Sequence, residues 1–420
     1  MKRAALGLLT LAFAVTLLGG PWGDERVSDL FLYRSYADLF LAGSLPFRDV
    51  AFEYPPLAAP LIALPGLAGT GEEAYRLAFA TLALALAAAV VLLVGALARR
   101  TGGSPRRAMM AAAMAPLLTG AMVRTHFDLA PVVLTLAALA LLCTHRPRAG
   151  LAVLGIGVMT KGFPLVVAPV ALAWLLSRGQ RRAAAEGAAA LALVVLTVAG
   201  AAAALSPSGA ADAVTYHLER PVQVESAPAM VLLGLDGLGA GDAVVGHSHR
   251  SEGVEHPASG PVAVLFGILL IGAVGFMTAS VARRRAPGRG MDGGQREARS
   301  LVLASLASVA AFAAFGKVLS PQFLIWVLPL GALALAWRMH ALAVAAGGAV
   351  ALTLMEFPSR YADVVARESS ALWLVAARDA VLIAVVALAA RELLVSRVPA
   401  RGSAGSRSRA HRRLPRPAPR

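Results

Sequence analysis

Carboxylates and tyrosines gather in one short stretch near the N-terminus, which opens with Ser28–Tyr33 and closes with Phe52–Pro56. Read as a helix, its first part places Asp29, Tyr33 and Tyr36 on one face, at i, i+4 and i+7. A carboxylate held in such a position can take the proton of a bound hydroxyl group. Asp29 is therefore a candidate for a chemical role in this stretch. Further substrate-binding candidates in this stretch are Tyr33, Glu53 and Tyr54. The alternative is a surface helix whose charges are merely solvated.

Lysine is rare in this chain, which has Lys2, Lys161 and Lys317 against many arginines. Lys161 and Lys317 both lie at the ends of apolar runs. A compact ammonium group at that depth is suited to a phosphate headgroup. Arg220 is a third candidate, because its guanidinium can bind phosphate with two hydrogen bonds. We predict that these three residues bind the phosphate of a donor; the alternative for the lysines is snorkelling to lipid headgroups.

Other polar residues complete the candidate set. Substrate-binding candidates outside the first stretch are Arg124, His126, Asp128, His217 and Gln322. His217 has the side chain best suited to proton transfer near neutral pH. A stretch at 247–256 holds three histidines and two glutamates, but its spacing fits no standard metal site, so we predict a loop and no metal. Signature motifs for nucleotides, nicotinamide cofactors and zinc proteolysis are absent from the sequence, and no cofactor is expected.

The elements that must position these residues are membrane helices. The 420 residues are 58% hydrophobic and only 15% charged, unlike soluble domains. Apolar runs of roughly 16–24 residues recur, each about long enough to cross a bilayer. We predict an all-α polytopic membrane protein with about twelve spans. They include 108–123 and 379–396. The membrane domain is expected over 1–396, and a basic, disordered cytoplasmic tail over 397–420.

The distribution of charge orients the predicted spans. Most arginines fall in the linkers on one side and most acidic residues on the other, so the positive-inside rule places both termini in the cytoplasm. The net charge of +15 follows from this topology, and nucleic acid is not an expected partner. Two large segments, 23–74 and 206–259, then face outward and carry most of the candidate residues. A multi-pass protein of the plasma membrane with an outward site points to a substrate dissolved in the membrane lipids.

The motifs also resemble a known family. The segments Ser28–Tyr36, Gly43–Asp49 and Phe52–Pro56 are similar to the first outer loop of polyprenol-phosphate-mannose-dependent mannosyltransferases, glycosyltransferase family 87 of the GT-C superfamily. Lys317–Pro329 is similar to a late-helix pattern of that group. The resemblance implies a GT-C bundle whose outer loops form the active-site cavity, with Asp29 as the catalytic aspartate. The chain differs from the family at Arg124–Asp128 and at the dipeptide Glu225-Ser226.

The expected activity is therefore inverting transfer of a sugar, with mannose expected, from a polyprenyl-phosphate donor to a lipid-linked or cell-envelope glycan. Cationic side chains would stabilise the leaving phosphate, so no metal is expected. Two alternatives remain at this stage. A flippase for a lipid-linked glycan would require polar residues throughout the membrane interior, and a non-catalytic scaffold would tolerate loss of the outer carboxylates.

Overall fold

The computed structural model describes residues 1–69, 71–283 and 291–395, and the predicted tail 397–420 lies outside this range. The helices of the first half are α1 (Lys2–Val15), α2 (Leu30–Leu41), α3 (Ala58–Ala63), α4 (Glu72–Arg100), α5 (Pro105–Ala113), α6 (Pro116–Thr119), α7 (Met122–Thr125), α8 (Leu129–Leu142), α9 (Pro147–Thr160), α10 (Val167–Ser177) and α11 (Arg181–Leu205). Those of the second half are α12 (Pro207–Glu219), α13 (Ala227–Gly237), α14 (Ser259–Ala282), α15 (Met291–Phe315), α16 (Leu328–Ala336), α17 (His340–Glu356), α18 (Tyr361–Val365) and α19 (Ser369–Val395). Shorter elements are the 3-10 segments η1 (Leu64–Ala68), η2 (Phe163–Val166) and η3 (Pro321–Trp326), and the strands β1 (Val222–Gln223), β2 (Val244–Ser248) and β3 (Ser251–Glu255).

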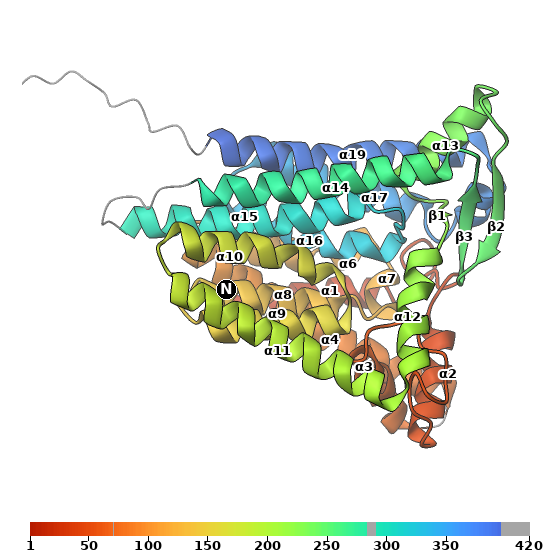
Figure 1. Ribbon diagram of the computed structural model, residues 1–420, viewed down its shortest axis with the longest axis horizontal. Coiled ribbons are helices and arrows are strands. Elements are labelled where there is room, and N and C mark those ends of the chain that lie inside the picture. Colours follow the sequence, from red (N-terminus) through yellow and green to blue (C-terminus); the bar gives the residue numbers. More distant parts are fainter. Residues whose placement is uncertain (70, 284–290, 396–420) are drawn as a thin grey trace, which may run out of the picture.

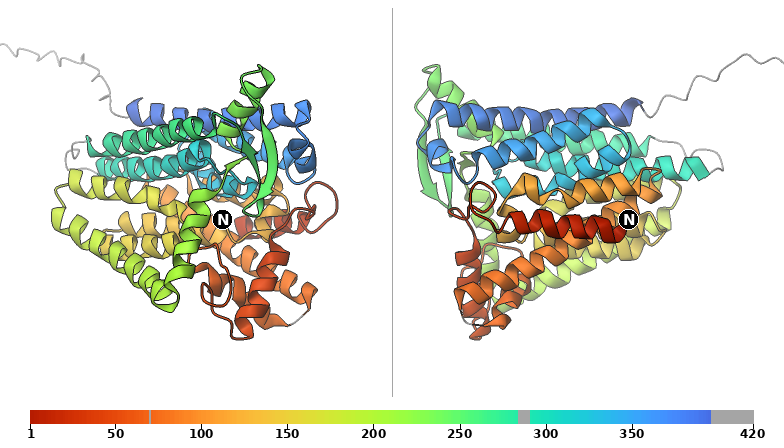
Figure 2. Two further views of the ribbon diagram at one scale, coloured as in Figure 1. Left: turned by 45° about the vertical axis from the view of Figure 1, so that its right-hand side comes forward. Right: turned by 180° about the vertical axis from the view of Figure 1, so that it is seen from behind.

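The long helices lie side by side as a bundle (Figure 1). The N-terminus and the last turn of α19 lie at the same end of this bundle, as Figure 1 and the view from behind in Figure 2 show. Helices α2 and α12 and the strands lie at the opposite end. The first and last described helices thus have these ends on one side of the bundle. That this side is the cytoplasm remains a prediction.

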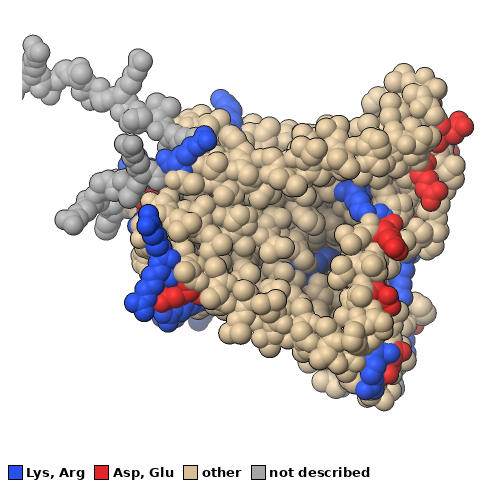
Figure 3. Space-filling model, viewed as in Figure 1, with Lys and Arg blue, Asp and Glu red and all other residues tan. Residues whose placement is uncertain are grey.

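Within the described ranges, five helices are long and apolar enough to cross a membrane: α4, α11, α14, the 293–315 part of α15, and α19. Other apolar helices of the described chain are shorter, with 10–17 residues. Charged side chains gather at the two ends of the molecule and leave an uncharged band between them (Figure 3). Such a band is expected of a surface that faces hydrocarbon. The count of about twelve spans stays a prediction.

Two predicted spans differ from the structure. The run 108–123 is not one helix, since α5, α6 and α7 follow one another there in short pieces. Pro116 begins α6, and Gly120 ends it with a φ of 56°, a conformation that favours glycine. The last predicted span, 379–396, begins ten residues earlier, at Ser369, because apolar residues continue the helical pattern on that side.

The expectation of an all-α protein is wrong in the segment 206–259, which contains a small antiparallel sheet in the order β1-β3-β2. The stretch 247–256, predicted as a loop, belongs largely to the β2–β3 hairpin. Val222 and Val254 pair across β1 and β3, and both side chains are buried in a cluster that includes residues of α13 and α19. β-branched residues that pack one face of a sheet favour strands over an open loop.

Helix α15 forms the centre of the bundle and leads to the site. In α15, 83% of the 18-residue apolar stretch that could span a membrane is buried. The corresponding share in α11, at the periphery, is 6%. Alanines such as Ala304, Ala307 and Ala311 are completely buried along α15, and small residues let neighbouring helices approach closely. The helices that contact it include α10, α14 and α19. Beyond Phe315, the chain turns through the short connection that carries Lys317 to η3.

Candidate active site

A cavity of about 530 Å³ lies at the end of the bundle that carries the strands. The space-filling view shows the surface hollowed there (Figure 3). The predicted site residues that line it are Asp29, Glu53, Tyr54, His126, Lys161, His217, Arg220, Lys317 and Gln322. They come from both predicted outer segments and from the ends of the bundle helices. The structure thus brings residues separated by up to 293 positions, Asp29 and Gln322, into one cavity.

Asp29 is the N-cap residue directly before α2, and its side chain lines the cavity instead of capping the helix. One turn later, the Tyr33 hydroxyl donates a hydrogen bond of 2.9 Å to Asp29 Oδ2. Tyr33 is fully buried behind the cavity wall, where its ring stacks on Phe79. Burial, followed by the nearby Asp29 charge, holds the pKa of Tyr33 well above its usual value. Tyr33 therefore acts as a permanent donor that orients Asp29 and leaves its other oxygen for a ligand.

His126 approaches the same carboxylate, with Nε2 3.6 Å from Asp29 Oδ2. On the other side of the ring, Nδ1 lies 2.9 Å from Thr125 Oγ1 and 3.4 Å from the Met122 carbonyl oxygen. The Thr125 hydroxyl donates its proton to the Ala121 carbonyl, so both neighbours of Nδ1 are acceptors. His126 thus lies between the Asp29 carboxylate and the end of α7.

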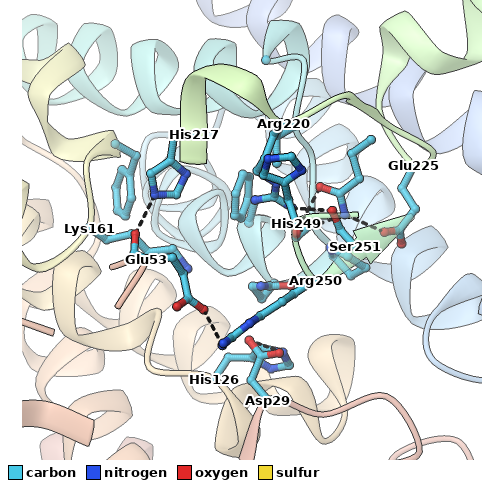
Figure 4. Close-up of a pocket in the computed structure, with 18 of the residues that line it drawn as sticks. Asp29, Glu53, His126, Lys161, His217, Arg220, Glu225, His249, Arg250 and Ser251 are labelled. Atoms are coloured by element: carbon cyan, nitrogen blue, oxygen red, sulfur yellow. Dashed lines mark hydrogen bonds and ion pairs between the residues drawn. The ribbon is translucent and has the colours of Figure 1, made fainter. Parts of the chain in front are cut away.

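Glu53 is the second carboxylate of the cavity. Tyr36 donates a short hydrogen bond to Glu53 Oε2, and Arg250 Nη1 lies 3.1 Å from Oε1. The His217 Nε2 lies 2.8 Å from the Glu53 carbonyl oxygen, so Nε2 carries the proton. Burial lowers the pKa of His217, which keeps the imidazole neutral near pH 7 with Nδ1 as an acceptor. Arg250 and His217 thus fix Glu53 from two sides (Figure 4).

Lys161 forms an ion pair at the base of the cavity. Its Nζ lies 2.7 and 2.9 Å from the two oxygens of Asp128, which is completely buried. Asp128 also accepts a 2.6 Å hydrogen bond from Trp326 Nε1. The ammonium lies 4.9 to 5.6 Å from the ring centres of Phe127, Phe323 and Trp326. The charge of Lys161 is therefore already balanced by a carboxylate and by three aromatic faces.

Arg220 and Lys317, here called the cation pair, lie on another wall of the cavity. Lys317 Nζ donates to the Leu218 carbonyl at 2.7 Å, and Arg220 Nη2 donates to Ser251 Oγ at 2.9 Å. No carboxylate forms an ion pair with either residue within the described ranges. Burial, and then the Arg220 charge, hold the pKa of Lys317 below its usual value. Two neighbouring positive charges without a counter-charge favour an anionic ligand.

The wall next to the cation pair is apolar. Leu270 of α14, Phe312 of α15 and Val318 line the cavity there, together with Phe323. Gln322 lines the same region. The cavity is thus lined by cations, by hydrocarbon side chains and by carboxylates. It can accommodate a ligand in which an anionic group joins an apolar chain to a hydroxylated part.

Three predicted site residues do not line the cavity, which corrects their expected positions. Tyr33 and Asp128 lie directly behind it, in contact with Asp29 and Lys161. Arg124 is buried among protein groups, where Nε donates to the Thr16 carbonyl at 2.9 Å and Nη1 pairs with Glu25. Its role here is to tie α7 to the end of α1.

Sequence reasoning assigned no role to several residues that line the cavity. Arg250 and His249 lie in a Gly- and Ser-rich stretch for which the sequence predicted a loop and not the β2–β3 hairpin. Glu225, which the sequence marked only as a departure from the family pattern, is completely buried at the cavity wall. Burial and the neighbouring Glu356 charge hold the pKa of Glu225 well above its usual value, which favours a protonated carboxyl group. In the sequence, the only sign of a role for Glu225 was that an acidic residue stands where the family pattern differs.

Among the described residues, no group of three or more His, Cys, Asp or Glu side chains is arranged to hold a metal ion. Metal independence remains a prediction that only an assay can test. The residues of the cavity offer a carboxylate that can take a proton, several hydrogen-bond donors and two cations that can bind an anion.

The model of glycosyltransferase family 87 matches residues 52–304, more than half of the chain. Among solved structures, the crystal structure of ArnT from Cupriavidus metallidurans in the apo state is similar at 18% sequence identity and a TM-score of 0.40. That alignment covers 93% of this chain and 76% of ArnT. A comparison with curated proteins finds no match.

Proposed function

The chain belongs to glycosyltransferase family 87, and from this premise we propose that it transfers a sugar from a polyprenyl-phosphate donor to a lipid-linked or cell-envelope glycan. We infer mannose as the sugar, transfer with inversion, and reaction on the extracytoplasmic face of the plasma membrane. The single observation that carries the proposal is the shared cavity. Asp29, the cation pair and the apolar residues Leu270, Phe312 and Val318 all line it.

The proposed reaction is a single displacement. A hydroxyl oxygen of the acceptor forms a bond to the anomeric carbon of the donor, and its proton passes to Asp29. The bond from that carbon to the phosphate oxygen breaks, and its electron pair stays on the leaving polyprenyl phosphate. Asp29 is the base because Tyr33 orients one oxygen and leaves the other free. His126 Nε2 lies 3.6 Å from Asp29 Oδ2 and helps to hold the carboxylate in place.

Charge that develops on the leaving phosphate is stabilised by Lys317 and Arg220. Lys161 takes a smaller part than the sequence suggested, because Asp128 neutralises it. The apolar wall with Leu270, Phe312 and Val318 supports a hydrocarbon chain on the donor. Glu53, Tyr54 and His217 lie in the polar half, where the hydroxyl groups of sugars would find their hydrogen-bond partners.

The test is Asp29→Asn, assayed on purified protein with radiolabelled polyprenyl-phosphate mannose. Asn keeps the shape and can accept from Tyr33 but cannot take a proton, so we expect transfer to fall by about 10²–10⁴-fold without loss of folding. Asp38→Asn is the matched control, since Asp38 lies on the same helix, is largely exposed and does not line the cavity. Full activity of Asp29→Asn would contradict the proposal.

The same substrate separates transfer from transport. A flippase would move the labelled lipid between leaflets of a vesicle without forming a new glycosidic bond. New product of higher mass identifies the enzyme. Replacement of the cavity carboxylates without any effect would instead favour a scaffold.

A further inference from the structure

The β2–β3 hairpin ends in a strained turn. Ser248 pairs with Ser251, so His249 and Arg250 alone make the turn. Their φ angles are 49° and 54°, the left-handed region at both positions. Two-residue turns of this kind strongly prefer Asn-Gly, because other side chains are strained there. Strain of this sort persists where the surrounding structure holds it in place, and it clusters at functional sites.

Both side chains of the turn line the cavity. Arg250 Nη1 lies 2.7 Å from the Tyr36 hydroxyl and 3.1 Å from Glu53 Oε1, and the guanidinium lies 5.5 Å from the centre of the Tyr36 ring. The His249 ring lies 5.1 Å from the Tyr216 ring, and the Tyr216 hydroxyl donates to the His249 carbonyl oxygen. The turn is thus held by contacts with two segments far away in the sequence.

The turn also connects the two halves of the cavity (Figure 4). On one side, Arg250 reaches Glu53 in the polar half. On the other, the next residue, Ser251, accepts the hydrogen bond of Arg220 from the cation pair. Apolar residues such as Leu270 and Phe312 come from other elements, so the hairpin contributes polar side chains to the cavity.

Glu53 gains a defined orientation from these contacts. Oε1 accepts from Arg250 and Oε2 from Tyr36, which leaves each oxygen with a further lone pair. A carboxylate held by two partners, with free lone pairs toward a cavity, is suited to receive neighbouring hydroxyl groups of a sugar. Arg250 lies beside it with further N–H donors on a guanidinium that is about half exposed.

We propose that the turn His249–Arg250 is an acceptor-recognition element, in which Arg250 positions the Glu53 carboxylate to bind adjacent hydroxyl groups of a glycan acceptor. The inference rests on the proposed function, because it names which substrate this half of the same site binds. Arg250 has two roles here: it orients Glu53, and its free N–H groups contact the sugar hydroxyl groups together with Glu53.

The strained turn supplies a sharp test. The double variant His249→Asn, Arg250→Gly replaces the turn with the sequence that its backbone prefers, so the hairpin should fold at least as well as before. At the same time it removes both side chains from the cavity. We expect an unchanged or higher melting temperature and an acceptor KM raised by about tenfold, the loss typical of a charged hydrogen bond. The donor KM should change by less than about twofold, because the double variant leaves the residues that bind the donor in place.

The probes are radiolabelled polyprenyl-phosphate mannose as donor and n-octyl α-D-mannopyranoside as acceptor. Arg250→Gln and Arg250→Lys are measured beside the double variant; Lys retains the charge but lacks the planar fork, so it should restore the acceptor KM only in part. His247→Ala is the matched control, because His247 lies on the same hairpin, does not line the cavity and is mostly exposed. It should behave as the parent protein.

Three results would overturn the inference: an unchanged acceptor KM in the double variant, a parallel rise of donor and acceptor KM, or a lower melting temperature, which would reveal a structural role. Equilibrium binding of the octyl mannoside without donor separates this inference from the proposed function. Absence of transfer by the parent protein contradicts the proposed function. Weaker binding of the octyl mannoside in the double variant still supports a sugar site at the turn, and equal binding overturns it.

Discussion

Lys161 and Lys317 are alike in sequence, yet the structure gives them different surroundings. Each follows an apolar run and precedes a short connection with a proline nearby. Lys161 forms an ion pair with the buried carboxylate of Asp128 and lies among three aromatic rings. Lys317 donates to a backbone carbonyl and lies near Arg220. The first lysine belongs to the framework of the site, and the second is available to a ligand.

This difference shows that the counter-charge of a buried cation decides whether the cation can bind a ligand. An ammonium with a carboxylate at 2.7 Å has little excess charge to offer a phosphate. Two neighbouring cations repel each other, which raises the free energy of the empty site. A bound anion relieves this repulsion. The four predictions that follow test this contrast, from the largest expected effect to the smallest.

The largest effect is expected on stability. Asp128→Asn would leave the ammonium of Lys161 buried without a counter-charge, so the free energy of unfolding should fall by about 3–5 kcal/mol. The double variant Lys161→Met, Asp128→Leu removes both charges and should recover most of the loss. Thermal denaturation of the detergent-purified protein measures both. If Asp128→Asn were as stable as the parent, Lys161 would not depend on this pair.

The cation pair should show the opposite behaviour. Lys317→Gln or Arg220→Gln removes a charge that only the ligand balances, so kcat/KM for the donor should fall by about 10²–10³-fold while the melting temperature stays the same. Steady-state kinetics with labelled donor measure the first, and denaturation the second. If a variant at Lys317 lowered the melting temperature without lowering donor affinity, Lys317 would be a residue that stabilises the fold, like Lys161.

The third prediction concerns pH. The Lys317 pKa lies below that of an ordinary lysine because of burial and then the Arg220 charge. Phosphate binding needs the ammonium form, so kcat/KM for the donor should fall as pH rises through this lowered pKa. Arg220→Gln removes the repulsion and raises the Lys317 pKa, which should shift the alkaline limb of the profile toward higher pH. An alkaline limb that moves downward, or stays fixed, would show that Arg220 does not act on Lys317.

The smallest effect is expected at an exposed ion pair. Arg48 and Asp49 pair at 2.9 Å with side chains 51% and 37% exposed, outside the cavity. Water screens such a pair, so Arg48→Gln should change neither the melting temperature nor the transfer rate measurably. The variant also serves as the control for the cation pair. A clear loss of activity would point to a substrate contact beyond the cavity described above.

Some of this site was readable from the sequence and some was not. Asp29 and Tyr33 were predicted together, because helical spacing alone brings i and i+4 onto one face. Arg220, Lys161 and Lys317 were predicted from their chemistry at the ends of apolar runs. Asp128 was predicted as a ligand contact, and its pairing with Lys161 across 33 residues could not be foreseen. Arg250 was missed because its position depends on a hairpin in a segment without a clear strand pattern.

The sequence by itself determined the class of protein, the family and the residue types of the site, since these follow from composition, local periodicity and short motifs. Tertiary structure alone decided which charges are balanced. Whether a lysine meets Asp128 or another cation depends on how helices distant in the chain pack, and the energy of a buried charge depends on those neighbours more than on the residue itself. The same packing brings Arg250 onto Glu53, across 197 positions of sequence.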